Sequence, residues 1–489
     1  MDKRKLSAGE FIEELKNISK RNSGDVKMDN IIIEEPLSLI GIGMQSLSFE
    51  DCEISQLSIS SEIRKSISLN GIKGEYIKIT NLGCNLISLN SCTLNSLDIK
   101  KNFNGKLNIG PSNEVKDILF ENIIPSGGEI YSKNKVVFSD CKLKELLKIN
   151  TRELTFSNNS NIIKLEPEKS INILKFLDSS CGHLQTSQQG NLTISGENVN
   201  LTTLEINYDI GELNFLNSSL QKIKLEGHQT SLNKISLSNC RGLESFTCDG
   251  YFVNEFYVDR IVNYSKFEIT HSNISDSLTM TDCDLSDAVF NDLNLSSCTC
   301  KFNRSFLVGA NFFNIQWNEK EMIGKENKKD LQELRERKEV FRQLKYAHSK
   351  QENALDASFF KVQELESYRK LLSIIRTRNI RVLGDRLILW THKVLGGYGV
   401  NVWVPFFWLF SAHLLWFCLS EFSPSIMNSA DDFSWTNTKL AIVSYFYFLN
   451  PVHPFFYQGE RIMSGWDILM RLSSGYFIFY FLKASRKFH

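Results

Sequence analysis

The chain has 489 residues, with 42% hydrophobic and 23% charged side chains, and its 56 basic and 56 acidic residues give a formal net charge of zero. This length allows two to four domains. A net charge of zero excludes a dominant attraction of the whole molecule to nucleic acid, so we do not expect nucleic acid as a partner. The basic residues 1–21 lack the apolar core of a secretory signal, which predicts that the N-terminal domain stays in the cytoplasm.

Residues 1–28 are expected to form an amphipathic capping helix. Its apolar side chains recur at helical spacing, namely Leu6, Phe11, Ile12, Leu15 and Ile18. Ser7 followed by Glu10 has the pattern of a capping box at a helix N-terminus. Such a helix would cover the first strands of the next domain, whose unpaired edge would otherwise invite aggregation.

An internal repeat fills residues 29–317. Two alternating apolar positions are followed by Asp, Asn or Ser, then by Cys, Ser or Gly, and then by a second short apolar strand. This template fits residues 47–59, 67–79 and 87–99, which are offset by 20 residues, and copies with irregular insertions continue to the end of the domain. Because one coil cannot bury its own inward face, the repeat predicts an all-β, right-handed parallel β-helix, or solenoid, of about a dozen to fourteen coils. A β-sandwich has a similar strand spacing, but gives no reason for the same residue types to recur at the same phase.

The repeat also explains the cysteines. Six of them directly follow an Asp, Asn or Ser at the end of an alternating strand, namely Cys52, Cys92, Cys141, Cys240, Cys283 and Cys298. No CxxC pair is present, and the spacing of Cys298 and Cys300 is wrong for a zinc knuckle. We therefore predict small buried residues at a repeated turn, with no disulfides and no metal site.

The last coils change to a five-residue period. Within residues 283–313 the large apolar residues fall at Leu285, Phe290 and Leu295, and then at Phe302, Leu307 and Phe312. This segment resembles the pentapeptide-repeat family, whose square β-helix places Leu or Phe in the core at every fifth residue. The resemblance implies pentapeptide-like final coils.

Residues 318–395 predict a helical stalk with a basic juxtamembrane segment. Helical spacing of apolar residues, uninterrupted by Pro or Gly over residues 325–383, indicates two helices joined near residues 348–353 as a hairpin or coiled coil. The basic residues that follow suit an anionic lipid surface. We expect headgroup contacts from these and from the C-terminal tail, namely Arg376, Arg378, Arg381, Arg386, Lys393, Arg486 and Lys487.

Residues 396–489 predict a two-span α-helical membrane domain. Residues 402–419 carry no charge, which predicts a first span at about 402–421. A broken apolar segment follows at residues 440–457, and a second span is expected at about 466–483. The acidic loop between them and the basic tail place both termini in the cytoplasm of a multi-pass protein of the bacterial inner membrane. Because a kinked apolar segment needs protein around it, we expect a homo-oligomer.

Polar groups inside this domain are candidates for lining a pore, since their burial in lipid is costly. They are His413, Asn450, His453, Asp467 and Arg471. Each also has a structural interpretation, as a hydrogen-bonding or ion-pairing group between helices. The sequence Gly396-Gly397-Tyr398-Gly399 imitates a potassium filter but precedes the first span, so potassium selectivity is not expected.

Three stretches carry a second resemblance, namely residues 341–370, 395–408 and 471–488. They are similar to the stalk, first membrane helix and last helix of bacterial membrane proteins that join solenoid repeats to an ion-channel-like helix pair. This resemblance implies that the solenoid senses a protein or small-molecule trigger. An oligomeric membrane domain would then act as a pore or membrane-disrupting effector, as in antiviral defence or stress.

Enzymatic motifs are lacking. The sequence contains no Walker, GxSxG or HExxH motif, so we expect no enzyme, no catalytic residues and no cofactor. Two alternatives remain open. One is a membrane-anchored scaffold that does not conduct, and the other is a carbohydrate-active β-helix enzyme whose paired carboxylates come from neighbouring coils.

Overall fold

We analysed a computed structural model of the chain. The residues that it describes are 3–22, 24–60, 63–80, 84–100, 103, 105–110, 112–125, 127–143, 148–167, 170–186, 191–261, 264–318, 331–375, 380–419, 435–452, 456–457, 460–461 and 465–485. They form two compact units, Met1–Gly324 and Lys325–His489, which are described separately.

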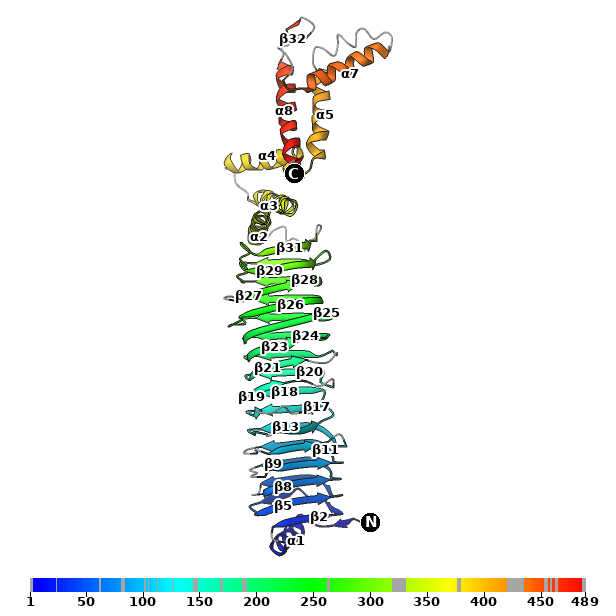
Figure 1. Cartoon of the computed structure of the whole chain (residues 1–489), viewed down its shortest axis with the longest axis vertical. Coiled ribbons are helices and arrows are strands. Elements are labelled where there is room, and N and C mark those ends of the chain that lie inside the picture. The colour runs from blue at the N-terminus through cyan, green and yellow to red at the C-terminus, as the bar shows by residue number, and fades with distance from the viewer. Residues whose placement is uncertain are drawn as a thin grey trace. The chain divides into compact units, whose positions relative to one another are not determined.

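The first unit is a parallel β-solenoid of about 13 turns, in which strands stack coil upon coil (Figure 1). The predicted β-helix is therefore confirmed. Registered partners lie 20 residues apart near the N-terminus, as for Leu86 and Ser66, and 22 apart near the end, as for Leu278 and Cys300. The 20-residue offset read from the sequence is thus the length of one early coil.

One face of the early coils is a seven-stranded parallel sheet. Its strands are β2 (Asp25–Asp29), β5 (Met44–Glu50), β8 (Ile63–Asn70), β10 (Leu86–Asn90), β12 (Lys106–Ile109), β14 (Gly127–Tyr131) and β17 (Lys148–Asn150). A second ladder runs through β4 (Leu37–Ile40), β7 (Gln56–Ser60), β9 (Lys73–Thr80), β11 (Thr93–Lys100), β13 (Glu114–Glu121), β15 (Lys135–Ser139), β18 (Glu153–Ser157), β20 (Ile173–Leu177), β22 (Thr193–Glu197) and β24 (Ile210–Leu216).

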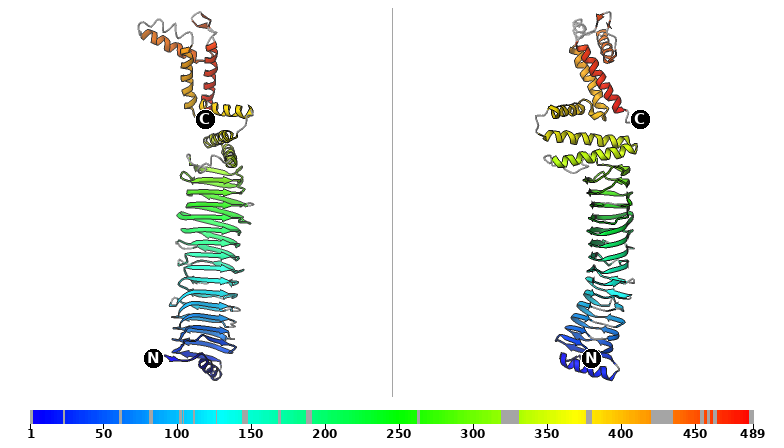
Figure 2. Two further views of the ribbon diagram at one scale, coloured as in Figure 1. Left: turned by 180° about the vertical axis from the view of Figure 1, so that it is seen from behind. Right: turned by 90° about the vertical axis from the view of Figure 1, so that its left-hand side faces the viewer.

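The long strands β25 (Ser219–Ser238) and β26 (Ser245–Asp259) continue this ladder into β28 (Asn273–Thr281) and β30 (Thr299–Asn303). Their N-terminal parts also belong to a third ladder. Its other strands are β16 (Lys142–Leu143), β19 (Asn161–Leu165), β21 (Ser180–Thr186), β23 (Asn200–Ile206), β27 (Lys266–Thr270), β29 (Ala288–Asn294) and β31 (Asn311–Gln316). Short strands β1 (Arg4–Lys5), β3 (Ile31–Ile33) and β6 (Glu53–Ile54) complete the first coils. Figure 2 shows the same stack from two further sides.

The core is built from inward side chains that repeat at the same phase of successive coils. Phe120, Phe138, Phe156 and Phe176 form a stacked column with ring centroids 4.8, 5.3 and 5.4 Å apart. The six apolar residues of the five-residue period in the last coils are all at most 3% exposed, namely Leu285, Phe290, Leu295, Phe302, Leu307 and Phe312. Nearest-neighbour stacking of this kind makes each coil depend on the next.

The repeated turn has a left-handed residue followed by a small buried one. Asp140, for example, has a φ of 52°, a conformation that Asn and Asp tolerate well. The next residue, Cys141, donates its thiol to carbonyl oxygens of Ser139 and Phe120, at 3.2 and 3.5 Å. Ser160 makes the equivalent bonds one coil later. All ten cysteines among the described side chains are free and buried, which confirms the predicted structural role.

Helix α1 (Ala8–Arg21) covers the first coils, but it is shorter than the predicted helical segment 1–28, because Arg4–Lys5 and Asp25–Asp29 are the strands β1 and β2 of the solenoid. Ser7 is its N-cap, and Ser7 and Glu10 exchange the two hydrogen bonds of a capping box. Phe11 and Leu15 are fully buried, and the Phe11 ring stacks on Phe49 at 5.9 Å. The helix therefore covers the unpaired edge of the first coils.

The second unit is helical. It contains α2 (Leu331–Lys350), α3 (Ala354–Ile374), α4 (Ile380–Val394), the 3-10 turn η1 (Gly397–Gly399), α5 (Trp403–Leu419), α7 (Trp435–Leu449) and α8 (Gly465–Ser485), with a hairpin of β32 (Phe456–Tyr457) and β33 (Glu460–Arg461). The predicted pair of stalk helices is present as α2 and α3. Asn353 caps α3, and Phe341 stacks on Phe360 between the two helices.

The predicted membrane domain is wrong. Within the described part of the chain, no helix combines the length and the apolar character needed to cross a bilayer. Helix α8, for example, includes the charged residues Asp467, Arg471 and Lys483. The spans at 402–421 and 466–483, the pore or membrane effector and the multi-pass location in the inner membrane are therefore not supported. The absence of charge over residues 402–419 was therefore not sufficient to predict a membrane span.

Candidate ligand groove

The side chains of three of the five predicted pore candidates lie in the described part of the chain. His413 is buried, and its ring meets Tyr445 edge to face at 4.9 Å, between α5 and α7. Asn450 accepts a hydrogen bond from the backbone nitrogen of Val452, which stabilises the turn after α7. Arg471 is half-buried on α8. His453 and the side chain of Asp467 lie outside the described residues.

Three of the seven predicted headgroup contacts lie in the described part of the chain. Arg386 donates to the carbonyl oxygens of Leu372 and Ile375, so it caps the C-terminus of α3. Lys393 pairs with Glu366 at 2.5 Å. Arg381 is exposed on α4, and a lipid role for it stays a prediction. The remaining residues of this set lie outside the described part, namely Arg376, Arg378, Arg486 and Lys487.

The filter-like motif has a structural role instead. The hydroxyl of Tyr398 donates to Glu366 at 3.2 Å, and Glu366 also accepts from Arg369 at 2.9 Å. A Cβ at Gly396 would lie 2.8 Å from the Tyr480 ring, so this glycine permits close packing against α8. The motif therefore ties α3 to the turn before α5.

A cleft lies on the solenoid, beside a break in the strand register. Strand β25 has three residues, Gly227, His228 and Gln229, where β26 has only Gly250. Gly250 has a φ of 72°, and a Cβ there would lie 2.0 Å from the carbonyl oxygen of Gly227. Only glycine fits this position, so the bulge is built into the local sequence.

Tyr251 fills the space beneath the bulge. It is 1% exposed, and its hydroxyl lies 3.1 and 3.2 Å from the carbonyl oxygens of Ile206 and Tyr208. Its backbone nitrogen donates to the hydroxyl of Ser272 in the next coil. Burial raises the pKa of Tyr251, so it remains a neutral structural support at physiological pH.

Two rows of polar side chains line the cleft, which has a volume of about 540 Å³. The acid–imidazole rail consists of His228, Asp249, His271 and Asp292, which are 21 or 22 residues apart. The amide rail consists of Asn273, Asn294 and Gln316, which pair in register on successive coils, with Phe252 preceding them. Each rail thus presents one side chain per coil.

One hydrogen bond links two members of the acid–imidazole rail, and neighbouring side chains bond to its two carboxylates. Asp249 accepts from the Thr270 hydroxyl at 2.7 Å and lies 2.8 Å from Nδ1 of His271. Burial opposes the ionised form of Asp249, but bonds from His271 and Thr270 outweigh it, and the pKa of this carboxyl is lowered. The same bond to Asp249 raises the pKa of His271. Asp292 accepts from the amide of Asn314 at 2.7 Å.

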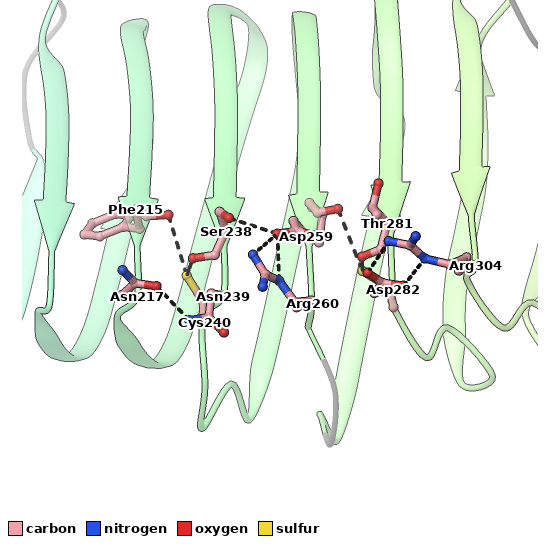
Figure 3. Close-up of polar contacts among 12 residues, drawn as sticks. Phe215, Asn217, Ser238, Asn239, Cys240, Asp259, Arg260, Thr281, Asp282 and Arg304 are labelled. Atoms are coloured by element: carbon pink, nitrogen blue, oxygen red, sulfur yellow. Dashed lines mark hydrogen bonds and ion pairs between the residues drawn. The ribbon is translucent and has the colours of Figure 1, made fainter.

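A different corner of the same coils provides a contrast (Figure 3). There Arg304 makes two bonds of 2.7 Å to Asp282, and Arg260 pairs with Asp259 at 2.8 Å. Asn239 donates to the side chain of Asn217 in the preceding coil. These polar groups hold neighbouring turns together. A second cleft, of about 440 Å³, is lined by Phe215 and Ser238 of this corner, but the two ion pairs are not part of its lining.

Sequence reasoning missed the groove. Its signal was a second polar periodicity, in which acids, imidazoles and amides recur every 21 or 22 residues on the outward phase. Within the described residues, no cluster of three or more His, Cys, Asp or Glu side chains is arranged to hold a metal ion. No protein-family model, curated protein or solved structure matches the chain, so its function must be argued from this geometry.

Proposed function

We propose that this protein is a non-enzymatic recognition protein whose solenoid binds a polar ligand in the groove between the two rails. The observation that carries the proposal is an open cleft of about 540 Å³ lined on successive coils by acids, imidazoles and amides. Small-molecule sites combine a concave surface with a few convergent polar groups. The buried Tyr251 and the tight bulge at Gly227 and Gly250 give these groups a rigid support.

Charge limits the ligand class. Asp249 and Asp292 place two carboxylates in the groove, and the lowered pKa of Asp249 keeps it ionised at neutral pH. Phosphate polymers and acidic ligands would meet repulsion from these groups. The groove therefore favours uncharged polyhydroxyl or amide ligands, or cations.

Two finer features of the solenoid belong to this proposal. We infer a right-handed coil, because nearly all parallel crossover connections have that hand. We also infer that the coils after Cys283 pack like pentapeptide repeats, which is supported by the buried five-residue period.

A fluorine reporter in the groove tests the proposal across several classes of ligand. Phe252 is 46% exposed beside the amide rail, and Phe306 is 49% exposed at another position in the solenoid. We would place 4-fluorophenylalanine at either position and titrate neutral oligosaccharides, polyamines, cationic peptides and amino acids. At least one class should shift the fluorine resonance at position 252 saturably and leave position 306 unchanged. Equal shifts at both positions, or none at 252, would refute the proposal.

A second candidate is a carbohydrate-cleaving enzyme, since Asp249 and Asp292 face one groove from coils two steps apart. That offset corresponds to roughly 10 Å, close to the separation in inverting glycosidases. A general acid needs a raised pKa, whereas the pKa of Asp249 is lowered. We therefore favour binding. Hydrolysis of a bound oligosaccharide that is lost in both Asp249→Asn and Asp292→Asn would reverse this preference.

A further inference from the structure

We infer that the ligand is a linear, uncharged oligosaccharide that lies along the solenoid axis with about one sugar residue per coil. The inference rests on the proposed function and names the ligand class of the same groove. Its basis is the regular spacing of the two rails. The amide rail runs through β28, β29 and β31, after Phe252 of β26, and the acid–imidazole rail extends from His228 of β25 to Asp292 of β29.

The spacing of the rails decides between polymers. Successive coils of a parallel sheet lie about 4.8 Å apart, so Asn273, Asn294 and Gln316 present equivalent amides at about that interval. An extended peptide presents equivalent backbone groups only every second residue, roughly 6.6 Å, and would fall out of step within two coils. A linear hexose chain advances by about one coil per residue, so successive sugars would meet an amide on one rail and, alternately, a carboxylate or an imidazole on the other.

The chemistry of the rails suits hydroxyl groups. Each amide of the amide rail offers both donors and an acceptor, and each carboxylate of the opposite rail accepts from hydroxyls. Phe252, exposed beside Asn273, supplies an apolar surface for the C–H face of a sugar ring. Nucleic acid is disfavoured because Asp249 and Asp292 repel phosphates, and uronic acids are disfavoured for the same reason.

The length of the groove adds a quantitative expectation. The amide rail and Phe252 occupy four consecutive coils, and the bulge at Gly227–Gln229 lies in the coil that precedes Phe252. Affinity should therefore rise with the number of sugar residues up to about four and then level off. A site for a single terminal sugar would show no such dependence.

The test uses the full chain, calorimetry and the fluorine reporter at position 252, with cello-oligosaccharides and chito-oligosaccharides of increasing length as probes. Asn294→Ala should weaken binding about three- to tenfold, because one amide contact is lost. Asn108→Ala is the matched control, since Asn108 is an exposed residue on β12, remote in sequence and register from the rails. Unchanged thermal unfolding of both variants shows that the solenoid is intact, and Asn294→Gln should recover part of the affinity.

The outcomes separate the ligand class from the proposed function. Saturable binding that levels off near four residues and weakens only in Asn294→Ala supports both. If polyamines or peptides shift the reporter but neither oligosaccharide series does, the ligand class is wrong and the recognition function stands. If no class shifts the reporter, both fail. Equal weakening by Asn294→Ala and Asn108→Ala would overturn the placement on the amide rail.

Discussion

The two units of the chain use apolar residues in opposite ways. In the solenoid, inward side chains such as Leu89 and Phe138 are fully buried, because every coil covers its neighbour. In the helical unit, Trp403 on α5 is 75% exposed and Leu472 on α8 is 66% exposed. A high apolar content therefore indicates a buried core only where a repeat supplies the covering surface. In the helical unit, the apolar content does not tell which surface covers these side chains.

In the solenoid, the effect of a mutation should therefore depend mainly on whether the side chain points inward or outward in its coil. Outward residues are free to carry function, as in the two rails, while inward residues are fixed by stacking. The homo-oligomer expected from the sequence stays a prediction for the helical unit, whose exposed faces on α5 and α8 are consistent with it. The following predictions test the contrast, beginning with the largest effect.

A charge on the inward phase should have the largest effect. Leu89 is 0% exposed in β10, so Leu89→Asp places an unpaired carboxylate in the core and should cost about 4 kcal/mol or more of the free energy of unfolding. Urea denaturation measures the loss, and hydrogen exchange should locate it in the coils around β8 and β12. Asn108→Asp, on the outward phase of the same sheet, should change stability little. A stable Leu89→Asp protein would contradict the inward assignment.

Removing one ring from the phenylalanine column should be the next largest effect. Phe138 stacks between Phe120 and Phe156 at 4.8 and 5.3 Å, so Phe138→Ala leaves a cavity and should cost about 3 to 5 kcal/mol. Phe407 on α5 is 64% exposed, and Phe407→Ala should change the free energy of unfolding by no more than about 0.5 kcal/mol. Similar losses for the two variants would erase the contrast between the units.

A conservative change at the repeated turn should have a small effect. Ser160 already makes the bonds that Cys141 makes one coil earlier, so Cys141→Ser should change stability by less than about 1 kcal/mol, whereas Cys141→Val loses the donor. Burial raises the pKa of the Cys141 thiol to about 11, so thiol reagents should label it only after unfolding. Rapid labelling of the native protein at this cysteine would show that the turn is open.

Much of the solenoid could be predicted because its pattern is local and repeated. The alternation of apolar and polar residues predicted the strands, and the polar residue before Cys141 predicted the turn. Ser7 with Glu10 predicted the start of the helix. The groove could not be predicted in the same way, since Asp249 and His271 meet only after two coils are placed in register. The membrane spans failed for another reason. Hydropathy reports a preference for burial, and no helix in the described part of the chain combines the length and apolar character that a span needs.

The smallest expected effect is the pH dependence of the groove, and it distinguishes the rails from the paired corner of Figure 3. The bond between Asp249 and His271 lowers the pKa of the Asp249 carboxyl and raises the pKa of the His271 imidazole. Because the folded pKa of His271 is raised, its stabilisation is complete below its ordinary value of 6.5 and is lost as pH rises through the folded pKa. Because the folded pKa of Asp249 is lowered, its stabilisation is present above pH 3.8, its ordinary pKa, and is lost as pH falls through the folded pKa.

The pair should therefore stabilise the groove most between about pH 4 and 6.5, with a modest effect because both side chains are about half exposed. Nuclear magnetic resonance titration of the His271 ring measures its pKa directly. Asp249→Asn should return that pKa toward 6.5, because the carboxylate that favours the imidazolium is gone. Asp282→Asn, which breaks the pair with Arg304, should leave the His271 titration unchanged. An unaltered pKa in Asp249→Asn would mean that the rail is not electrostatically linked, and the groove would then lack the pH response that sets it apart from the structural corner.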